Sequence, residues 1–206
     1  DAEGRPANPY RGDSALARIH LVSALLVVPQ MVLQSFGLVW LIADQRWDAT
    51  AAGLAVGVAQ LLGAFGRIGA GLLSDRVGSR LRPLRWVAVA GIPLLLLTAG
   101  AGMLHEPAPV AVAFVLASCV AVADNGLAFT AVAEIAGAHW SGRALGVQNT
   151  GQFLAAAACV PLWGTLIALV GYPAAFALTA VAPAVAIPLI PRDAGAVRSP
   201  AAGPRD

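Results

Sequence analysis

Long apolar runs, separated by short polar connections, dominate this sequence from about residue 18 onward. Six stretches are each about 20 residues or longer, which is the length that an α-helix needs to cross a bilayer. They lie roughly at residues 18–43, 49–73, 84–104, 108–133, 143–170 and 173–191. The alternating pattern of a membrane β-barrel is absent, and backbone polar groups in lipid must be bonded within the segment. The pattern therefore predicts an all-α membrane protein with six transmembrane helices.

Composition supports a membrane protein over a soluble one. The sequence is 58% hydrophobic and only 12% charged, and its mean hydropathy is +0.75. We interpret residues 1–15 as a cytoplasmic linker, 16–191 as one six-helix transmembrane domain, and 192–206 as a disordered cytoplasmic tail. The chain starts at Asp1, with no signal-peptide pattern, so we expect it to be a fragment or to lack its start.

Arginines fall almost entirely on one side of the predicted spans. If the N-terminus is cytoplasmic, six spans return the C-terminus to the cytoplasm. The arginines of both flanks and of the connections after the second and fourth spans then lie inside, and Arg46 lies outside. This is the distribution that the positive-inside rule favours. The sequence predicts a multi-pass protein of the cell (plasma or inner) membrane with both termini cytoplasmic.

The connection between the second and third spans carries a pattern beyond its charge. It reads Gly71-x-x-x-Asp75-Arg76-x-Gly78-x-Arg80. This resembles the signature loop of the major facilitator superfamily (MFS), G-x-x-x-D-R-x-G-R-R, which joins the second and third helices of each six-helix half. Ser79 departs from that pattern, since the family usually has a basic residue there. The resemblance implies a conformational latch between the two halves, and an ordinary topology-setting loop is the alternative.

A second stretch, residues 142–176, also resembles the family. Matching positions at the start of the fifth and sixth spans are Gly142, Arg143, Gly146, Gly171, Tyr172 and Phe176. The resemblance covers residues 16–191 as a C-terminal six-helix half. It implies two inverted three-helix repeats, residues 18–104 and 108–191, and secondary active transport of a small solute by alternating access. A missing N-terminal six-helix half would be the partner.

In this family the first and fourth helices of a half line the central cavity, and both predicted spans carry polar residues. Gln30 and Gln34 lie four apart, on one helix face. Asp124 and Asn125 lie in the fourth span, and Asp124 is the only carboxylate deep within any span. An intramembrane aspartate costs about 2.5–3.5 kcal/mol on insertion scales and usually faces a cavity or a partner. We expect these residues on the substrate and proton pathway, with structural hydrogen bonding between helices as the alternative.

Other polar residues within the spans are weaker candidates. Gln148, Asn149 and Gln152 form a polar patch on the fifth span, which we interpret first as packing or half-to-half interface and second as pathway. Arg67 is expected to reach the lipid head groups or to pair with Asp75 or Glu134. Glu134 itself is interpreted as a solvated loop residue.

Several function classes are disfavoured. The sequence has no H-E-x-x-H, phosphate-loop or G-x-S-x-G motif, so we predict no enzyme and no cofactor. The histidines fall in different connections, so we predict no metal site, and the net charge of +2 gives no reason to expect nucleic acid. The predicted partners are a small-molecule solute, protons and the lipid bilayer. A self-contained six-span homodimeric transporter and a non-transporting scaffold or sensor subunit remain as alternatives.

Overall fold

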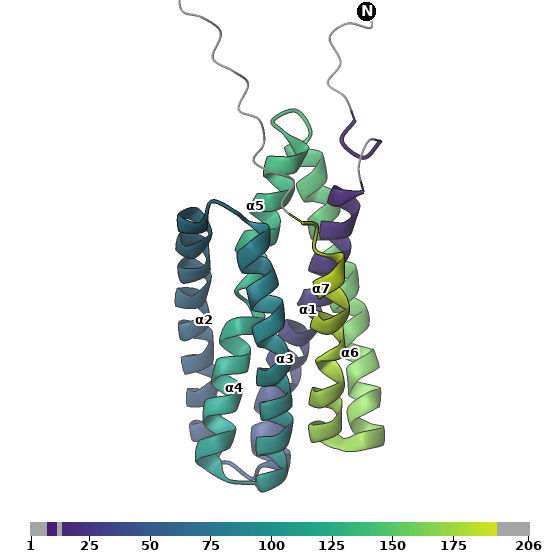
Figure 1. Ribbon diagram of the computed structural model, residues 1–206. Helices are drawn as coiled ribbons and strands as arrows, with labels where there is room; N and C mark the ends of the chain where they lie inside the picture. The colour runs from purple at the N-terminus through teal and green to yellow at the C-terminus, as the bar shows by residue number, and fades with distance from the viewer. Residues whose placement is uncertain (1–7, 12–13, 193–206) are drawn as a thin grey trace, which may run out of the picture.

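A computed structural model describes residues 8–11 and 14–192 as a bundle of helices that stand side by side (Figure 1). The elements are α1 (Ala15–Val39), the π-helix η1 (Trp40–Asp44), α2 (Ala49–Val77), α3 (Leu81–Leu104), α4 (Pro107–Ala121), α5 (Asp124–Ala136), α6 (Ser141–Thr179) and α7 (Val181–Leu189). The described residues form no strand, so the predicted all-α class is confirmed. Most of the predicted linker and nearly all of the predicted tail lie outside the described residues.

The described part contains five helical segments that are long and apolar enough to cross a membrane. They run over Ala15–Asp44, Ala49–Val77, Leu81–Leu104, Pro107–Ala136 and Ser141–Leu189. The last is 49 residues long and contains both of the last two predicted spans. Gly171 interrupts it, with φ 78° and ψ 169°, and Figure 1 shows the chain turning back so that α7 lies beside α6. The structure therefore confirms five apolar helical segments, whereas the sequence predicted six separate spans.

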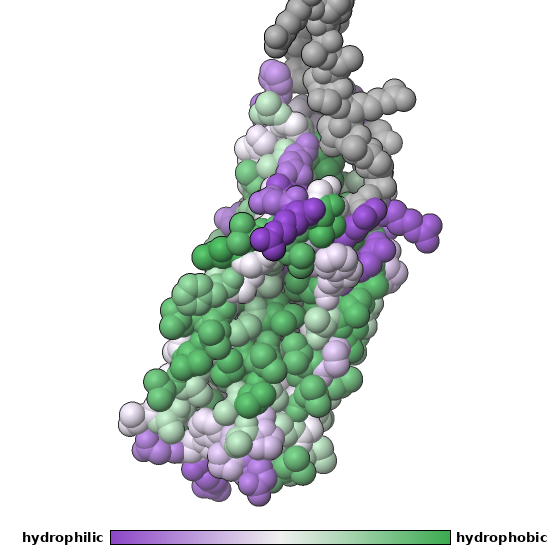
Figure 2. Space-filling model, turned by 60° about the vertical axis from the view of Figure 1, so that its left-hand side comes forward, coloured by the Kyte–Doolittle hydropathy of each residue, from purple (hydrophilic) through white to green (hydrophobic). Residues whose placement is uncertain are grey.

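Arginines gather at one end of the bundle, which we call the arginine-rich end. The start of α1, the end of α7 and the α2–α3 and α5–α6 connections all lie there (Figure 1). Arg46 lies in the α1–α2 connection, at the opposite end. Figure 2 shows a broad apolar band with hydrophilic residues gathered at both ends. This is the surface expected of a protein that spans a bilayer.

Both ends of α2 are fixed by local hydrogen bonds. At its start, the Asp48 carboxylate accepts from the backbone N–H groups of Ala51 and Thr50, at 3.2 and 2.9 Å, and these bonds lower the pKa of Asp48. At its end, Gly78 has φ 65°, which a residue with a β-carbon adopts only with strain. The N–H of Gly78 bonds to the Asp75 carbonyl and that of Ser79 to the Ser74 carbonyl. These two bonds form a Schellman motif, which turns the chain toward α3.

The π-helix η1 joins α1 to its neighbours at the end opposite the arginines. Trp40 is fully buried and packs edge-on against Phe176, with 4.8 Å between the ring centroids. Its indole N–H donates to Asp44, which also accepts from the Gln45 amide. The same Gln45 amide donates to the Gly102 carbonyl of α3 at 2.9 Å. The widened turn thus anchors α1 to α3 through the Gln45 amide N–H and to α6 through the Trp40 ring.

Large apolar side chains cover the outer surfaces of α2 and α6. Eight of them are at least 60% exposed: Leu54, Leu61, Phe65, Ile68, Phe153, Leu154, Leu162 and Leu169. A contiguous apolar surface of this kind faces lipid or another protein.

Gly37 provides a test of how closely α1 and α4 pack. A β-carbon at Gly37 would lie 2.5 Å from the Phe114 ring, so we expect Gly37→Ala to destabilise the protein by about 1–3 kcal/mol. The measurement is the thermal unfolding midpoint in detergent micelles. The matched control is Gly57→Ala, because a β-carbon at Gly57 meets nothing within 4 Å. Truncating Phe114 to leucine should restore the Gly37→Ala variant, and equal midpoints for the two alanine variants would contradict this packing.

Candidate functional site

Amide side chains from three helices meet inside the bundle. The Asn125 amide of α5 donates to the Gln30 carbonyl oxygen of α1 at 2.8 Å. The Gln152 amide of α6 lies 3.3 Å from the Asn125 oxygen and donates to the Ser23 hydroxyl of α1. Ser23 and Gln30 are both buried. We call these four residues the amide network, and it joins three residues that the sequence singled out separately.

Gln34 lies one turn beyond Gln30 and lines a narrow crevice beside the amide network. Gln60 of α2 and Ser118 of α4 line the same crevice. Gln34 and Gln60 are exposed, although both belong to helices apolar enough to cross a membrane. The sequence analysis missed Gln60, Ser118 and Ser23. An amide in the middle of the second apolar run was the available signal for Gln60.

Asp124 is the first residue of α5 and is 1% exposed. It lines a small cavity of about 20 Å³, whose other lining residues are apolar and come from α1, α3, α4 and α7. Neither carboxylate oxygen has a side-chain hydrogen-bond partner among the described residues. The structure therefore places Asp124 in a different cavity from the Gln30–Gln34 crevice, although Asn125 follows it in the chain.

A break between α4 and α5 separates these two cavities. The helix ends at Ala121 and starts again at Asp124. The Arg67 guanidinium of α2 donates to the Val122 carbonyl at the break, at 3.1 Å. Gly63 permits this close approach, because a β-carbon there would lie 2.9 Å from the Val122 side chain. Among the described residues Arg67 makes no ion pair with Asp75 or Glu134, so the predicted pairing is wrong.

The predicted latch loop is held by Arg80. Its guanidinium pairs with Asp75 of α2 and, at 3.0 Å, with Glu134 of α5. The same group donates to the Ser74 hydroxyl at 3.0 Å, and Ser74 donates to the Ser79 carbonyl. The carboxylates of Asp75 and Glu134 raise the pKa of Arg80. The loop therefore connects the end of α2 to the end of α5.

The other predicted latch residues contribute differently. Gly78 makes the turn, as described above, whereas no ion pair or hydrogen bond of the Arg76 side chain occurs among the described residues. A β-carbon at Gly71 would meet nothing within 4 Å among them. Glu134, interpreted from sequence as a solvated loop residue, is half-exposed and ion-paired. Its pairing joins segments 54 residues apart, which no local pattern reports.

A second polar cluster lies at the arginine-rich end. His20 of α1 bonds through one ring nitrogen to the Gln148 amide oxygen of α6 and through the other to the Tyr10 hydroxyl, the latter at 2.9 Å. Gln148 is 1% exposed, whereas Asn149 is exposed. Of the three polar residues noted on the fifth span, the amide network contains only Gln152. His20 belongs to a helix, not to the connection that we expected.

Comparison with known proteins identifies the family. The sequence model of the Major Facilitator Superfamily matches residues 11–205. The chain therefore belongs to this superfamily, and it is a multi-pass membrane protein of a transporter family. It is 50% identical over 191 residues to the "Uncharacterized MFS-type transporter Rv2994" of Mycobacterium tuberculosis (strain ATCC 25618 / H37Rv). It is equally similar to the "Uncharacterized MFS-type transporter MT3072" of Mycobacterium tuberculosis (strain CDC 1551 / Oshkosh).

The chain spans about two fifths of the length of the curated relatives it matches. Each alignment covers 92% of this chain and 42% of the relative. The similarity thus extends over nearly all of the bundle, including the latch loop and the amide network.

The amide network can be tested by a double-mutant cycle on Gln30 and Asn125. Interhelical hydrogen bonds in membranes average about 0.6 kcal/mol, with an upper value of about 1.7. We expect Gln30→Ala and Asn125→Ala to show a coupling energy in this range, measured by reversible unfolding in mixed micelles. The control pairs Gln30→Ala with Asn149→Ala, since Asn149 is exposed outside the network, and it should show no coupling. Independent effects of Gln30 and Asn125 would contradict the contact.

Proposed function

We propose that the chain forms the C-terminal six-helix half of a secondary transporter, which moves a small solute by alternating access and couples this movement to protons. In this proposal the two arms of the last segment are the fifth and sixth crossings. Residues 18–104 and 108–191 are then inverted repeats. Both chain ends lie in the cytoplasm, as the arginine-rich end favours. An N-terminal six-helix half would complete the carrier.

The observation that carries this proposal is the exposure of amides on apolar helices. Gln34, Gln60 and Asn149 lie at the surface of helices that are long and apolar enough to cross a bilayer. An amide that faces hydrocarbon without a hydrogen-bond partner is costly. These faces are therefore expected to border a water-filled pathway or a second half.

The amide network would provide the solute contacts on this side of the pathway. Amides both donate and accept hydrogen bonds, so Gln30, Gln34 and Asn125 suit a neutral or cationic solute with polar groups. The exchange of a network bond for a bond to solute would shift the relative position of α1, α5 and α6. That shift is the link between binding and helix movement in this proposal.

Asp124 is the proposed proton carrier. It is buried, it has no side-chain partner among the described residues, and it adjoins Asn125 in the first turn of α5. Charging a group in an apolar cavity is unfavourable, so the cavity must gain water or α5 must move when the proton leaves. The α4–α5 break would permit that movement.

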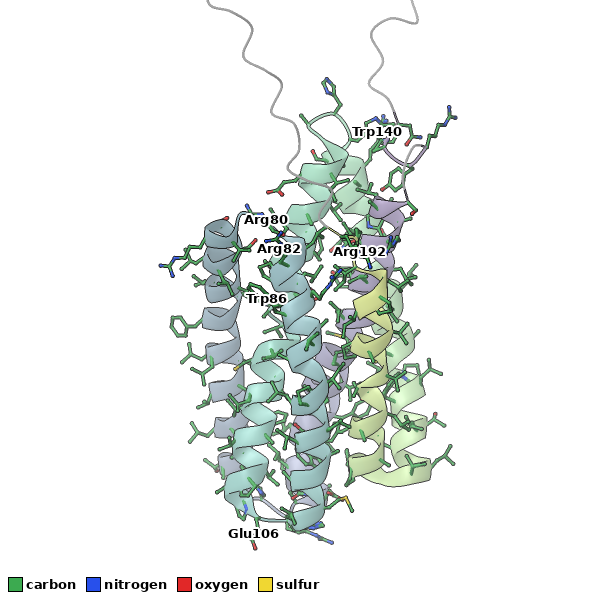
Figure 3. All side chains as sticks on the ribbon, in the orientation of Figure 1. Arg80, Arg82, Trp86, Glu106, Trp140 and Arg192 are labelled. Atoms are coloured by element: carbon green, nitrogen blue, oxygen red, sulfur yellow. The ribbon has the colours of Figure 1, made fainter. Side chains whose placement is uncertain are left out.

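The proton role is tested with the full-length protein in vesicles under an imposed pH gradient. The probes are tetraphenylphosphonium and a panel of neutral drug-like solutes, and internal pyranine reports proton movement. We expect Asp124→Asn to remove the gradient-driven component of flux. Glu106→Gln is the control, because Glu106 is exposed in the α3–α4 connection, at the end of the bundle opposite the arginine-rich end (Figure 3). Unchanged gradient-driven flux in Asp124→Asn would exclude Asp124 from coupling.

The latch role is tested by comparing two arginines of one loop. Arg80 uses separate nitrogens for Glu134 and Asp75, a geometry that a lysine ammonium cannot reproduce. We expect Arg80→Lys to lower the transport rate severalfold and Arg76→Lys to leave it near wild type. The measurement is initial flux of the same probes at matched protein density. Equal rates for the two variants would show that the loop needs only positive charge.

A further inference from the structure

A cavity of about 370 Å³ opens at the arginine-rich end, away from the amide network. Its lining residues are Leu81, Arg82, Arg85, Trp86, Pro191 and Arg192. The first two turns of α3 form one side, and Pro191 and Arg192, which lie just beyond the end of α7, form the other. Figure 3 shows Arg82, Trp86 and Arg192 gathered at this end of the bundle. The described lining residues of the cavity include three arginines and no carboxylate, a chemistry that favours an anion.

Arg85 holds the two sides of the cavity together and retains an unused donor. One terminal nitrogen of its guanidinium donates to the Ile190 carbonyl at 2.9 Å. Its Nε is buried and has no hydrogen-bond partner among the described residues. A buried donor without an acceptor is unfavourable and rare in native proteins. An acceptor supplied by a ligand would remove that penalty.

The nearby carboxylates are already engaged. Both ion pairs of the described residues involve Arg80, which takes Asp75 and Glu134. Neither Arg85 nor Arg192 has an ion-pair partner among these residues. The start of the 24-residue helix α3 adds the partial positive charge of a helix N-terminus to the same region. Arg85 and Arg192 therefore carry charges that no ion pair among the described residues balances.

Trp86 indicates whether the anion is a small free ion or the phosphate of a lipid. Trp86 is 50% exposed and lies on α3 one turn beyond Arg82, on the side away from the arginine-rich end (Figure 3). Exposed tryptophan is enriched at the boundary between hydrocarbon and lipid head groups. An apolar surface beside the arginines would add nothing to the binding of a small free anion. A lipid has both a phosphate and apolar chains.

We propose that this cavity binds the phosphodiester head group of an anionic membrane lipid. Arg82, Arg85 and Arg192 contact the phosphate oxygens, because guanidinium groups match phosphate in charge and geometry. The acyl chains run past Trp86 along the apolar band. Basic cavities between transmembrane helices on the cytoplasmic side are suited to such lipids. The bound lipid joins the start of α3 to the end of α7 and adds stability that depends on lipid composition.

The test compares two double variants of the full-length protein. Arg82→Gln/Arg192→Gln removes two charges from the cavity, and Arg76→Gln/Arg143→Gln removes two from the same end outside it. Arg85 is kept in both, because it holds Ile190. The probes are phosphatidylglycerol and phosphatidylcholine, added to delipidated protein in detergent and followed by native mass spectrometry and unfolding midpoint. We expect wild type and the control to prefer phosphatidylglycerol and the cavity variant to bind it about tenfold more weakly or worse.

A second measurement does not depend on those variants folding normally. Brominated phosphatidylglycerol should quench tryptophan fluorescence more than brominated phosphatidylcholine does, and Trp86→Phe should remove the difference. Equal lipid preference in the two double variants would overturn the proposal. So would stabilisation by inorganic phosphate alone with no response to phosphatidylglycerol, because the ligand would then be a free anion.

Discussion

The structure depends on one constraint: a backbone polar group within hydrocarbon must find its partner in the protein. Unbroken helices meet that constraint by themselves, but this bundle interrupts its helices at several places, and three of them show the compensation. At η1, the Gln45 amide donates across to the Gly102 carbonyl of α3. At the α4–α5 break, Arg67 donates to the Val122 carbonyl. Near the turn at Gly171, the Trp163 indole donates to the Ala175 carbonyl and the Thr179 hydroxyl.

Each of these bonds joins residues that are well separated along the chain, so each interruption also becomes a tertiary contact. The α4–α5 break shows the consequence most clearly. Successive residues of a helix point about 100° apart, which follows from 3.6 residues per turn. At the first turn of α5 this rotation sends Asp124 toward an apolar cavity and Asn125 toward Gln30. A helix restart thus places an acid and an amide in two different environments while keeping them on one rigid element.

The sequence predicted what depends on long averages along the chain. Apolar runs of about 20 residues, and arginines on one side of them, follow from the cost of moving charge and backbone into lipid. It also identified Gln30, Asn125 and Gln152, since amides stand out in apolar helices. It could not predict the α4–α5 break, because neither proline nor glycine occurs at residues 120–124. Nor could it predict the hydrogen bond of Arg67, because the acceptor is a backbone carbonyl 55 residues away.

Polar groups whose hydrogen-bonding capacity is not fully used within the described part of the protein indicate what each surface contacts. On α1 and α2 they are the mid-helix amides of Gln34 and Gln60, beside large exposed apolar side chains, and such surfaces need water or a protein partner. On α3 and after α7 they are arginines at the end of the apolar band, beside an exposed tryptophan, where phosphate is the available acceptor. Both kinds follow from the same constraint, applied at different depths. In our two proposals, the partner at mid-depth is another protein surface or a solute pathway, and the partner at the head-group level is a membrane lipid.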